Sequence, residues 1–564
     1  MPAGRMPPHA RAMRDFAQHQ VGHPGDDHPD VFDRIYERND RGTISRREAL
    51  AGGAALGAAL LLGASVRNTA AEALGSDQAP FPTSKLTPHS ARVAIVGAGL
   101  AGVAAAYQLT KVGVHVELFE ARDRVGGRCW TAREFDQGQS AEHGGEFIDT
   151  RHVHLRDLAH DLGLHFDDLW KGWVSGSTWP NWVGGQLMSH ADIKAQLNPI
   201  IHAVISEAHR IGVFDSGHPT TAAYTFGTAT ARARALDRRS MAEWLDAKVP
   251  GVIGTPFADY LDEIMGSWYG LEMDQLSAVN WIDYFVIPWP GGDERWRVRG
   301  GNDLVPNKAA RKLPAHALKL ETALTSITRS NGLYRLRFDG GHSAEADLLI
   351  LALPFTTLRQ VDLNGSGLSQ QKLRAIEQQG MGADVKLLLQ YDQRPQTFNN
   401  WSGGMEHTDP NFETWESSTD EHGDHGLITV YAGGRTGAGW TARMPHGRPP
   451  QAFTQQTLAQ IDEVVPGSAA HFNGNAWIDL WTQDRWTRGA YAAFTPGQMT
   501  KFWGYNGSAD GNIHFAGEHT STYSQGFLNG GVESGYRAAI EVMRKLGITP
   551  PASIANLPYS VVTS

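Results

Sequence analysis

The 564-residue chain has a single cysteine, Cys129, and no excess of positive charge. One thiol excludes an internal disulfide and a metal site built from several thiolates of one chain. The formal net charge of −10, from 50 Lys and Arg against 60 Asp and Glu, argues against a nucleic-acid-binding protein. The histidines at 143, 152 and 154 lack the spacing of a three-ligand set, so we expect no metal. Glycine is abundant instead, with 63 residues, which indicates many close backbone approaches or left-handed turns.

The N-terminal region does not read as part of a folded domain. Residues 1–42 are rich in Pro, His, Asp and Arg without a sustained apolar period, and we interpret them as a disordered leader. The pair Arg46-Arg47 then precedes the uncharged stretch Ala49–Val66, and a small-residue A-x-A site follows at 71–73. Residues 43–73 therefore resemble a twin-arginine signal peptide, which implies the twin-arginine export machinery as a partner and a periplasmic or secreted location. The alternative is an uncleaved membrane anchor, for which this stretch is short and rich in Gly and Ala.

A glycine-rich motif follows the first predicted strand, Arg92–Val96. The motif is G-x-G-x-x-G with its glycines at Gly97, Gly99 and Gly102, and an Ala-rich helix and the strand Val114–Phe119 come after it. In such a unit the first glycine allows a tight turn, the second lets the backbone approach a pyrophosphate, and the third lets the helix pack on the strand. Glu120, at the end of the second strand, is placed to accept hydrogen bonds from a ribose and would repel the 2′-phosphate of NADP. The segment predicts a dinucleotide site.

Two further segments indicate which dinucleotide is bound. Residues 120–128 (EARDRVGGR) resemble the second glycine motif of flavoproteins in the amine oxidase superfamily. Residues 513–520 and 525–539 are similar to the C-terminal FAD motif of flavin monoamine oxidases and L-amino acid oxidases. The resemblance covers about 88–548 and implies FAD as the cofactor. It assigns to FAD, besides Gly97, Gly99, Gly102 and Glu120, the residues Arg122, Gly126, Gly127, Arg128, Gly145, Glu146, Leu324, Gly517, Glu518 and Phe527.

The same resemblance implies an α/β fold of two interleaved domains. We expect a Rossmann-like FAD-binding domain from 88–166, 292–360 and 475–548, and an α+β substrate-binding domain from 167–291 and 361–474. In the second domain, apolar residues at helical spacing between 193 and 205 predict an amphipathic helix. Residues 385–391 and 427–431 predict strands.

Family members align the substrate amine between two aromatic rings that stand perpendicular to the flavin. Here the resemblance implies Tyr491 and Phe527 for these rings, and ordinary packing is the alternative. Lys386 aligns with the family lysine that bonds flavin N5 through a water and assists the reaction with O2. The alternative is a lysine on the solvent face of its strand, since a buried lysine is costly unless it is paired.

Departures from the family pattern bear on flavin attachment and on the substrate. Members with covalent flavin have a cysteine where Ala490 stands, so we expect noncovalent FAD. Amino acid oxidases of the snake-venom type have an arginine at the position of Phe147, where amine oxidases have an aromatic residue. Glu146 or Asp149 would suit a cationic amine, whereas Arg151 would suit a carboxylate.

The resemblance implies oxidative deamination of a primary amine or an L-amino acid by O2, yielding H2O2. A polyamine oxidase is one alternative, and so is an amino acid oxidase with an unusual carboxylate site. A flavin desaturase or isomerase of the same fold, or a flavoprotein without enzymatic activity, is a more distant one. A homodimer is a further expectation that nothing in the sequence tests.

Overall fold

The computed structural model describes residues 90–172, 174, 176–212, 224–286 and 293–558. The predicted leader and export signal lie outside these residues. Within the described part of the chain, no helix is both long and apolar enough to span a bilayer.

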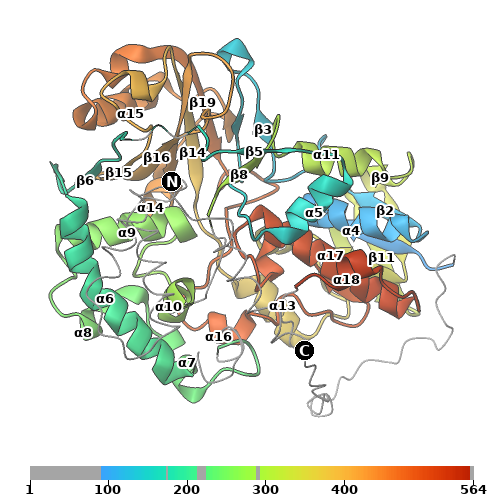
Figure 1. Ribbon diagram of the computed structural model, residues 1–564. Helices are drawn as coiled ribbons and strands as arrows, with labels where there is room; N and C mark the ends of the chain where they lie inside the picture. Colours follow the sequence, from blue (N-terminus) through green and yellow to red (C-terminus); the bar gives the residue numbers. More distant parts are fainter. Residues whose placement is uncertain (1–89, 173, 175, 213–223, 287–292, 559–564) are drawn as a thin grey trace, which may run out of the picture.

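A five-stranded parallel sheet carries the first glycine motif (Figure 1). Its strand order is β20-β13-β1-β2-β9, so strands from three separated parts of the sequence lie side by side. Strand β1 is buried along its whole length, as expected for a parallel sheet covered on both faces. Helices α4 and α17 pack against each other beside it. The bounds are β1 Val93–Val96, α4 Leu100–Lys111, β2 Val116–Phe119, β9 Leu318–Lys319, β13 Leu348–Leu351, β20 Ile513–Phe515 and α17 Leu528–Lys545.

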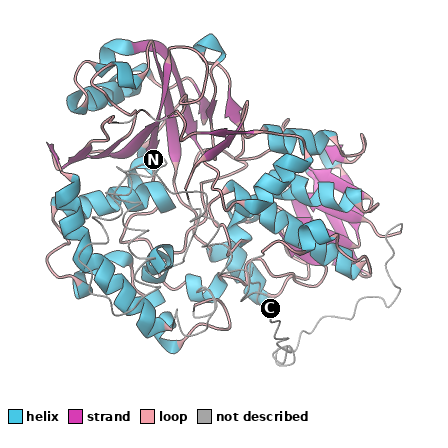
Figure 2. Cartoon of the chain, viewed as in Figure 1, coloured by secondary structure: helices cyan, strands magenta, loops and turns pink. Residues whose placement is uncertain are grey.

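A second, eight-stranded sheet lies apart from the first and has the order β18-β19-β14-β17-β16-β15-β6-β7 (Figures 1 and 2). Its central strand β14 is buried at all seven positions, so both faces of this strand are covered. The predicted strands at 385–391 and 427–431 are present as β14 and β17. The bounds are β6 Asn181–Val183, β7 Gln186–Leu187, β14 Val385–Tyr391, β15 Met405–Thr408, β16 Asn411–Glu416, β17 Gly426–Ala432, β18 His446–Gly447 and β19 Phe472–Leu480.

Helices gather on the side of the eight-stranded sheet away from α15 (Figure 2). The longest of them, α6, begins where the Ser189 side chain accepts a hydrogen bond from the Asp192 amide, and it ends at Gly212 in a left-handed conformation. It buries the apolar face predicted from the sequence. The bounds are α6 His190–Ile211, α7 Ala231–Asp237, α8 Met241–Lys248, α9 Pro256–Tyr269, α10 Ala278–Val286 and α15 Gln451–Val464.

Shorter elements connect these layers. They are β3 Thr131–Ala132, β4 Ala141–Glu142, α5 Val153–Asp161, β5 Phe166–Asp168, β8 Trp296–Val298, α11 Leu304–Arg311, β10 Leu324–Ser330, β11 Leu333–Phe338, β12 Ser343–Ala346, α12 Phe355–Leu358, α13 Gln370–Gln378, α14 Gly434–Gly439, α16 Met499–Phe502 and α18 Ala552–Ala555. The α/β class predicted from the sequence is confirmed. Strand β19 runs across the domain boundary drawn at 474/475, and the interleaved domain limits stay a prediction.

Candidate active site

One pocket is lined by residues from both sheets and from the helices, from Val96 at the end of β1 to Gly531 in α17. Every site residue predicted from the sequence lines it except Gly102 and Asp149, which was one candidate partner for a cationic amine. These lining residues are Gly97, Gly99, Glu120, Arg122, Gly126, Gly127, Arg128, Gly145, Glu146, Phe147, Leu324, Lys386, Tyr491, Gly517, Glu518 and Phe527. Residues that are more than 400 positions apart in the sequence therefore face one cavity.

The first glycine motif lines this pocket through Gly97 and Gly99. Gly97 has a φ of +99°, a conformation that favours glycine, and it turns the chain from β1 into α4. A Cβ on Gly102 would lie 1.8 Å from the Gly97 carbonyl oxygen, so any side chain there would push the helix away from the turn. Gly99 pairs with Gly126 of the second glycine motif in an isolated bridge. The two motifs thus form one backbone surface without side chains.

Two helix N-termini end at this surface. Leu100 and Ala101 in the first turn of α4 line the pocket, and so do Phe527 and Leu528 at the start of α17. Helix N-termini carry unpaired amides and partial positive charge, which suits a diphosphate. Gly535 of α17 allows the close contact between the two helices, because a Cβ there would lie 2.3 Å from the Ala101 carbonyl oxygen.

Glu120 is fixed at the end of β2 by two backbone amides. One carboxylate oxygen accepts a hydrogen bond from the Ala98 amide at 2.7 Å, and the other accepts one from the Arg122 amide at 2.9 Å. Burial raises the pKa of Glu120, although both amides favour the charged form. A carboxylate held in this way at the pocket wall suits a ribose. Together with the glycine surface and the helix ends, it shows that these residues fit the FAD that the resemblance implies.

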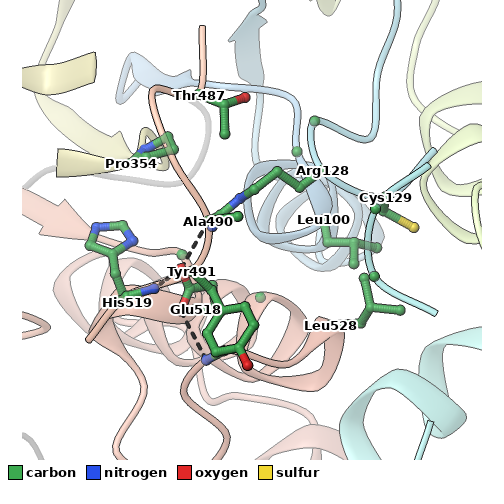
Figure 3. A pocket seen from close by; sticks show the side chains of 18 of the residues that line it. Leu100, Arg128, Cys129, Pro354, Thr487, Ala490, Tyr491, Glu518, His519 and Leu528 are labelled. Carbon is green, nitrogen blue, oxygen red and sulfur yellow. Dashed lines mark hydrogen bonds and ion pairs between the residues drawn. The ribbon is translucent and has the colours of Figure 1, made fainter. Parts of the chain in front are cut away.

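Glu518 and Arg128 join the second glycine motif to the C-terminal motif (Figure 3). The Arg128 guanidinium donates to Glu518 Oε1 at 2.9 Å, and the Gly526 amide donates to Glu518 Oε2 at 2.9 Å. After strand β20 the chain forms the short 3₁₀ turn Glu518–Thr520. Helix α17 begins at Leu528, two residues after the Gly526 amide that donates to the Glu518 carboxylate.

The two predicted aromatic rings, Tyr491 and Phe527, both face the pocket. The Tyr491 hydroxyl donates to the Trp268 carbonyl oxygen and, at 3.3 Å, to the Ser267 carbonyl oxygen. The residue before Phe527, Gly526, lies against the Tyr491 ring, since a Cβ on it would be 2.7 Å from Tyr491 Cδ2. The Tyr491 ring is therefore fixed at its hydroxyl and packed along one side by Gly526.

Lys386 points into the protein and is paired. Its ammonium lies 3.1 Å from Glu146 Oε2 and donates to the Glu142 carbonyl oxygen at 3.0 Å. The Trp415 indole N–H donates to the same Glu146 oxygen at 3.0 Å. The solvent-facing alternative for Lys386 is wrong, because its side chain is buried and lines the pocket.

The carboxylates proposed from the sequence to attract an amine already have cationic partners. Lys386 pairs with Glu146, and Arg297 lies 4.0 Å from the other Glu146 oxygen. Arg151 pairs with Asp149 at 2.8 Å. Arg151 also lies over the Phe527 ring, 6.0 Å from its centroid, and lines the pocket. Within the described ranges, no group of three His, Cys, Asp or Glu residues is arranged to hold a metal ion.

Sequence reasoning missed an acidic wall of the pocket formed by Asp384 and Glu413, with Tyr431 beside them. Asp384 Oδ2 accepts a hydrogen bond from the Tyr491 amide at 3.1 Å. Among the described residues, none donates a hydrogen bond to the Glu413 carboxyl, and Glu263, Glu294 and Asp384 raise its pKa further after burial has raised it. In the sequence, Asp384 comes two residues before Lys386, where an apolar strand begins. An acidic residue so close to the predicted pocket lysine could have indicated that Asp384 also faces the pocket.

Comparison with known proteins gives consistent matches over most of the chain. A family model described as "Flavin containing amine oxidoreductase" matches residues 100–543. The amine oxidase [flavin-containing] A of Sus scrofa is 24% identical over 478 residues, which cover 81% of this chain and 86% of the relative. The structure of putrescine oxidase bound to putrescine has a TM-score of 0.68 at 22% identity, covering 80% of this chain and 99% of that one. Cyclohexylamine oxidase from Brevibacterium oxydans also has a TM-score of 0.68, at 24% identity, covering 81% and 99%.

Proposed function

Because the chain belongs to the family of flavin-containing amine oxidoreductases and uses FAD, we propose that it oxidises a primary amine with O2. Overall, the amine, O2 and water would give a carbonyl compound, ammonia and H2O2. Bound FAD supplies the acceptor for the two electrons that leave the C–N unit. The protein's own residues would bind the amine, orient its C–H bond and keep water away.

The observation that carries this proposal is the pocket wall around Tyr491 and Phe527. Tyr491 is held through its hydroxyl by two backbone carbonyls and through its amide by Asp384. A rigid ring of this kind fixes the position of a small substrate at low entropic cost. Its electron-rich face also attracts an amine that carries partial or full positive charge.

Charge in the pocket favours an amine over a neutral lipid. Glu413 offers a carboxyl with no described donor, while Lys386 and Arg128 have their charges countered by Glu146 and Glu518. Burial raises the pKa of Glu413, and a cationic amine beside this carboxyl would favour its ionised form. The names of the similar putrescine and cyclohexylamine oxidases agree with an amine, and this agreement supports the proposal.

An L-amino acid is the second candidate substrate, and Arg151 favours it. Its guanidinium lies over the Phe527 ring and lines the pocket, so it is placed to meet a substrate carboxylate.

A peroxide-release assay across aromatic monoamines, polyamines and L-amino acids tests the proposal. We expect peroxide with at least one amine, and anaerobic loss of the oxidised flavin absorbance with the same compound. Peroxide only with L-amino acids would select the second candidate. Bleaching without any amine, by a lipid-like substrate, would indicate a desaturase or isomerase. No bleaching with any compound would indicate a flavoprotein without this activity.

Two further features are proposed from the sequence alone. We infer noncovalent FAD, since Ala490 has no nucleophile, and acid precipitation should release the flavin into the supernatant. We also infer export through the twin-arginine route. Replacing both Arg46 and Arg47 by lysine should retain the protein in the cytoplasm, and undiminished periplasmic activity would contradict this inference.

A further inference from the structure

His446 lies in the edge strand β18, between two buried aspartates. Its Nδ1 is 2.8 Å from Asp479 Oδ1, and its Nε2 is 2.9 Å from Asp484 Oδ2. The His446 side chain is only 12% exposed, and the Trp130 and Trp481 rings pack around it at centroid distances of 5.4 and 4.6 Å. Water therefore has little access to either contact.

The two contacts fix the protonation state of the ring. An ionised carboxylate only accepts hydrogen bonds, and a neutral imidazole has a single N–H to donate. Both contacts are satisfied at once only when His446 is an imidazolium that donates from both nitrogens. The charges around the ring agree, because the histidine contacts hold the pKa values of Asp479 and Asp484 below their ordinary range.

Asp484 connects His446 to residues that line the FAD pocket. Its two oxygens accept from the Arg122 guanidinium at 2.7 and 2.8 Å in a fork-shaped pair. Arg122 also donates to Thr487 Oγ1 at 2.9 Å, and its backbone amide binds Glu120. Arg122, Thr487 and Glu120 all line the pocket.

Asp479 connects His446 to the eight-stranded sheet. It lies on β19 directly opposite Lys386 of β14, and its second oxygen binds His143 Nδ1 at 2.9 Å. The His143 ring packs against Trp130 at a tilt, with a centroid distance of 3.8 Å. The guanidinium of Arg124, a residue of the second glycine motif, lies 4.2 Å from the centroid of that indole. The titratable groups around His446 are thus the two aspartates, with Arg122 beyond Asp484, His143 beyond Asp479 and Arg124 beyond Trp130.

We propose that His446 is a positioning residue for FAD. As an imidazolium between Asp479 and Asp484, it holds the Arg122 guanidinium at the pocket and ties the glycine motifs to the eight-stranded sheet. Loss of one proton from His446 leaves a ring nitrogen facing a carboxylate without a hydrogen between them, so the hydrogen bond from the ring to one aspartate is lost. FAD retention then depends on the charge of a residue that does not line the FAD pocket.

The direction of the pH effect follows from the geometry. The two carboxylates raise the pKa of His446, although its burial lowers it. Both hydrogen bonds from the imidazolium to Asp479 and Asp484, here called the clamp, are therefore formed below the ordinary histidine value of about 6.5. The clamp is lost as pH rises through the raised value. FAD affinity should therefore fall about tenfold as His446 loses its proton. This alkaline step is at the lower end of the range of affinity losses seen when the hydrogen-bond partner of a binding side chain is removed.

The test measures the FAD dissociation constant of the holoenzyme by flavin fluorescence between about pH 6 and about pH 10. His446→Gln should bind FAD about tenfold more weakly at the acid end and should lose the alkaline step. His471→Gln is the matched control, since His471 forms a surface pair with Asp392 at 3.1 Å, and it should leave both the affinity and the step unchanged.

Three results would overturn the proposal. One is a wild-type FAD affinity that stays constant over this pH range, a measurement that needs no variant to fold. Another is an alkaline step that persists in His446→Gln. The third is a His446→Gln protein that binds FAD as tightly as the wild type at the acid end of the range, which would mean that the charged ring does not support the FAD site. None of these readouts depends on which substrate the enzyme uses.

Discussion

Tyr431 of β17 lies directly opposite Lys386 of β14 in the antiparallel register. Glu413 of β16 in turn lies opposite Tyr431, so an ammonium, a phenol and a carboxyl form one row across three strands. At about 4.8 Å between strands, the row is roughly 10 Å long. Its ammonium end is paired with Glu146, and its carboxyl end is open to the pocket.

The open end of this row should contribute to substrate binding. Glu413→Gln should raise KM for an amine substrate about tenfold and change kcat less, because a hydrogen bond to a charged group contributes about 1.5–3 kcal/mol. Steady-state kinetics with the best amine from the peroxide assay checks this. The exposed Glu377→Gln serves as the control, and an unchanged KM in Glu413→Gln would exclude the role.

The same carboxyl should give amine binding a pH dependence. Burial and then the neighbouring acids raise the pKa of Glu413 well above its ordinary value, so the carboxyl is neutral at low pH and ionises only as pH rises. Amine KM should therefore fall as pH rises through this value. Measuring the amine KM as a function of pH in the wild type and in Glu413→Gln tests this prediction. The variant should lack the part of the profile in which KM falls with rising pH. A fall that remains in the variant must come from another group.

Lys386 should act on oxygen rather than on the amine. A cation in a buried pocket stabilises negative charge that develops on O2, and removal of such a group typically costs about a hundredfold. Lys386→Met should slow reoxidation of the reduced protein by O2 by about this factor, while anaerobic reduction by the amine changes less. Stopped-flow absorbance separates the two half-reactions. Wild-type reoxidation in the variant would remove the role, and the exposed Lys312→Met should behave as wild type.

Tyr491 allows its ring and its hydroxyl to be tested separately. Tyr491→Phe keeps the ring but loses the hydrogen bonds to the Ser267 and Trp268 carbonyls, so we expect a loss in kcat/KM below about tenfold. Tyr491→Ala removes the surface that orients the substrate and should cost about a hundredfold. Equal losses in the two variants would mean that the hydroxyl, not the ring, carries the effect.

Gly102 and Gly113 form a matched pair for the glycine motif. Gly102→Ala would place a Cβ 1.8 Å from the Gly97 carbonyl oxygen, so we expect a loss of more than about 4 kcal/mol in unfolding free energy and a protein without FAD. Gly113→Ala meets open space at φ +79° and should cost only about 1–2 kcal/mol. Thermal unfolding and flavin content measure both. A folded, flavin-loaded Gly102→Ala protein would contradict the packing argument.

The part of the site that the sequence predicted well is the part made by contiguous motifs. Gly97, Gly102 and Glu120 belong to one strand–turn–helix–strand unit, and local geometry alone relates them. The burial of Lys386 did not follow from its sequence, because β14 is covered on both faces and its apolar run has no alternation that marks an outer side. Its facing is set by pairing with β17 and β19, which lie elsewhere in the sequence.

Residues that the sequence did not reveal depend on strand register. Glu413 joins the pocket because β16 pairs with β17, and His446 reaches Asp479 because β18 pairs with β19. A shift of one residue in either register would turn these side chains to the opposite face. Each is a single polar residue without a recognisable motif, so composition and spacing gave no sign of it.

The contact between α4 and α17 has a consequence for how the enzyme is made. Both helix ends belong to the same cofactor surface, yet about 430 residues of chain separate Ala101 from Gly535. A ribosome adds residues at about 5–20 per second, so the two ends become available tens of seconds apart. A growing chain therefore lacks a complete flavin cradle until α17 has emerged. Cofactor loading is consequently an event at the end of synthesis, and a chain truncated before α17 should accumulate without flavin.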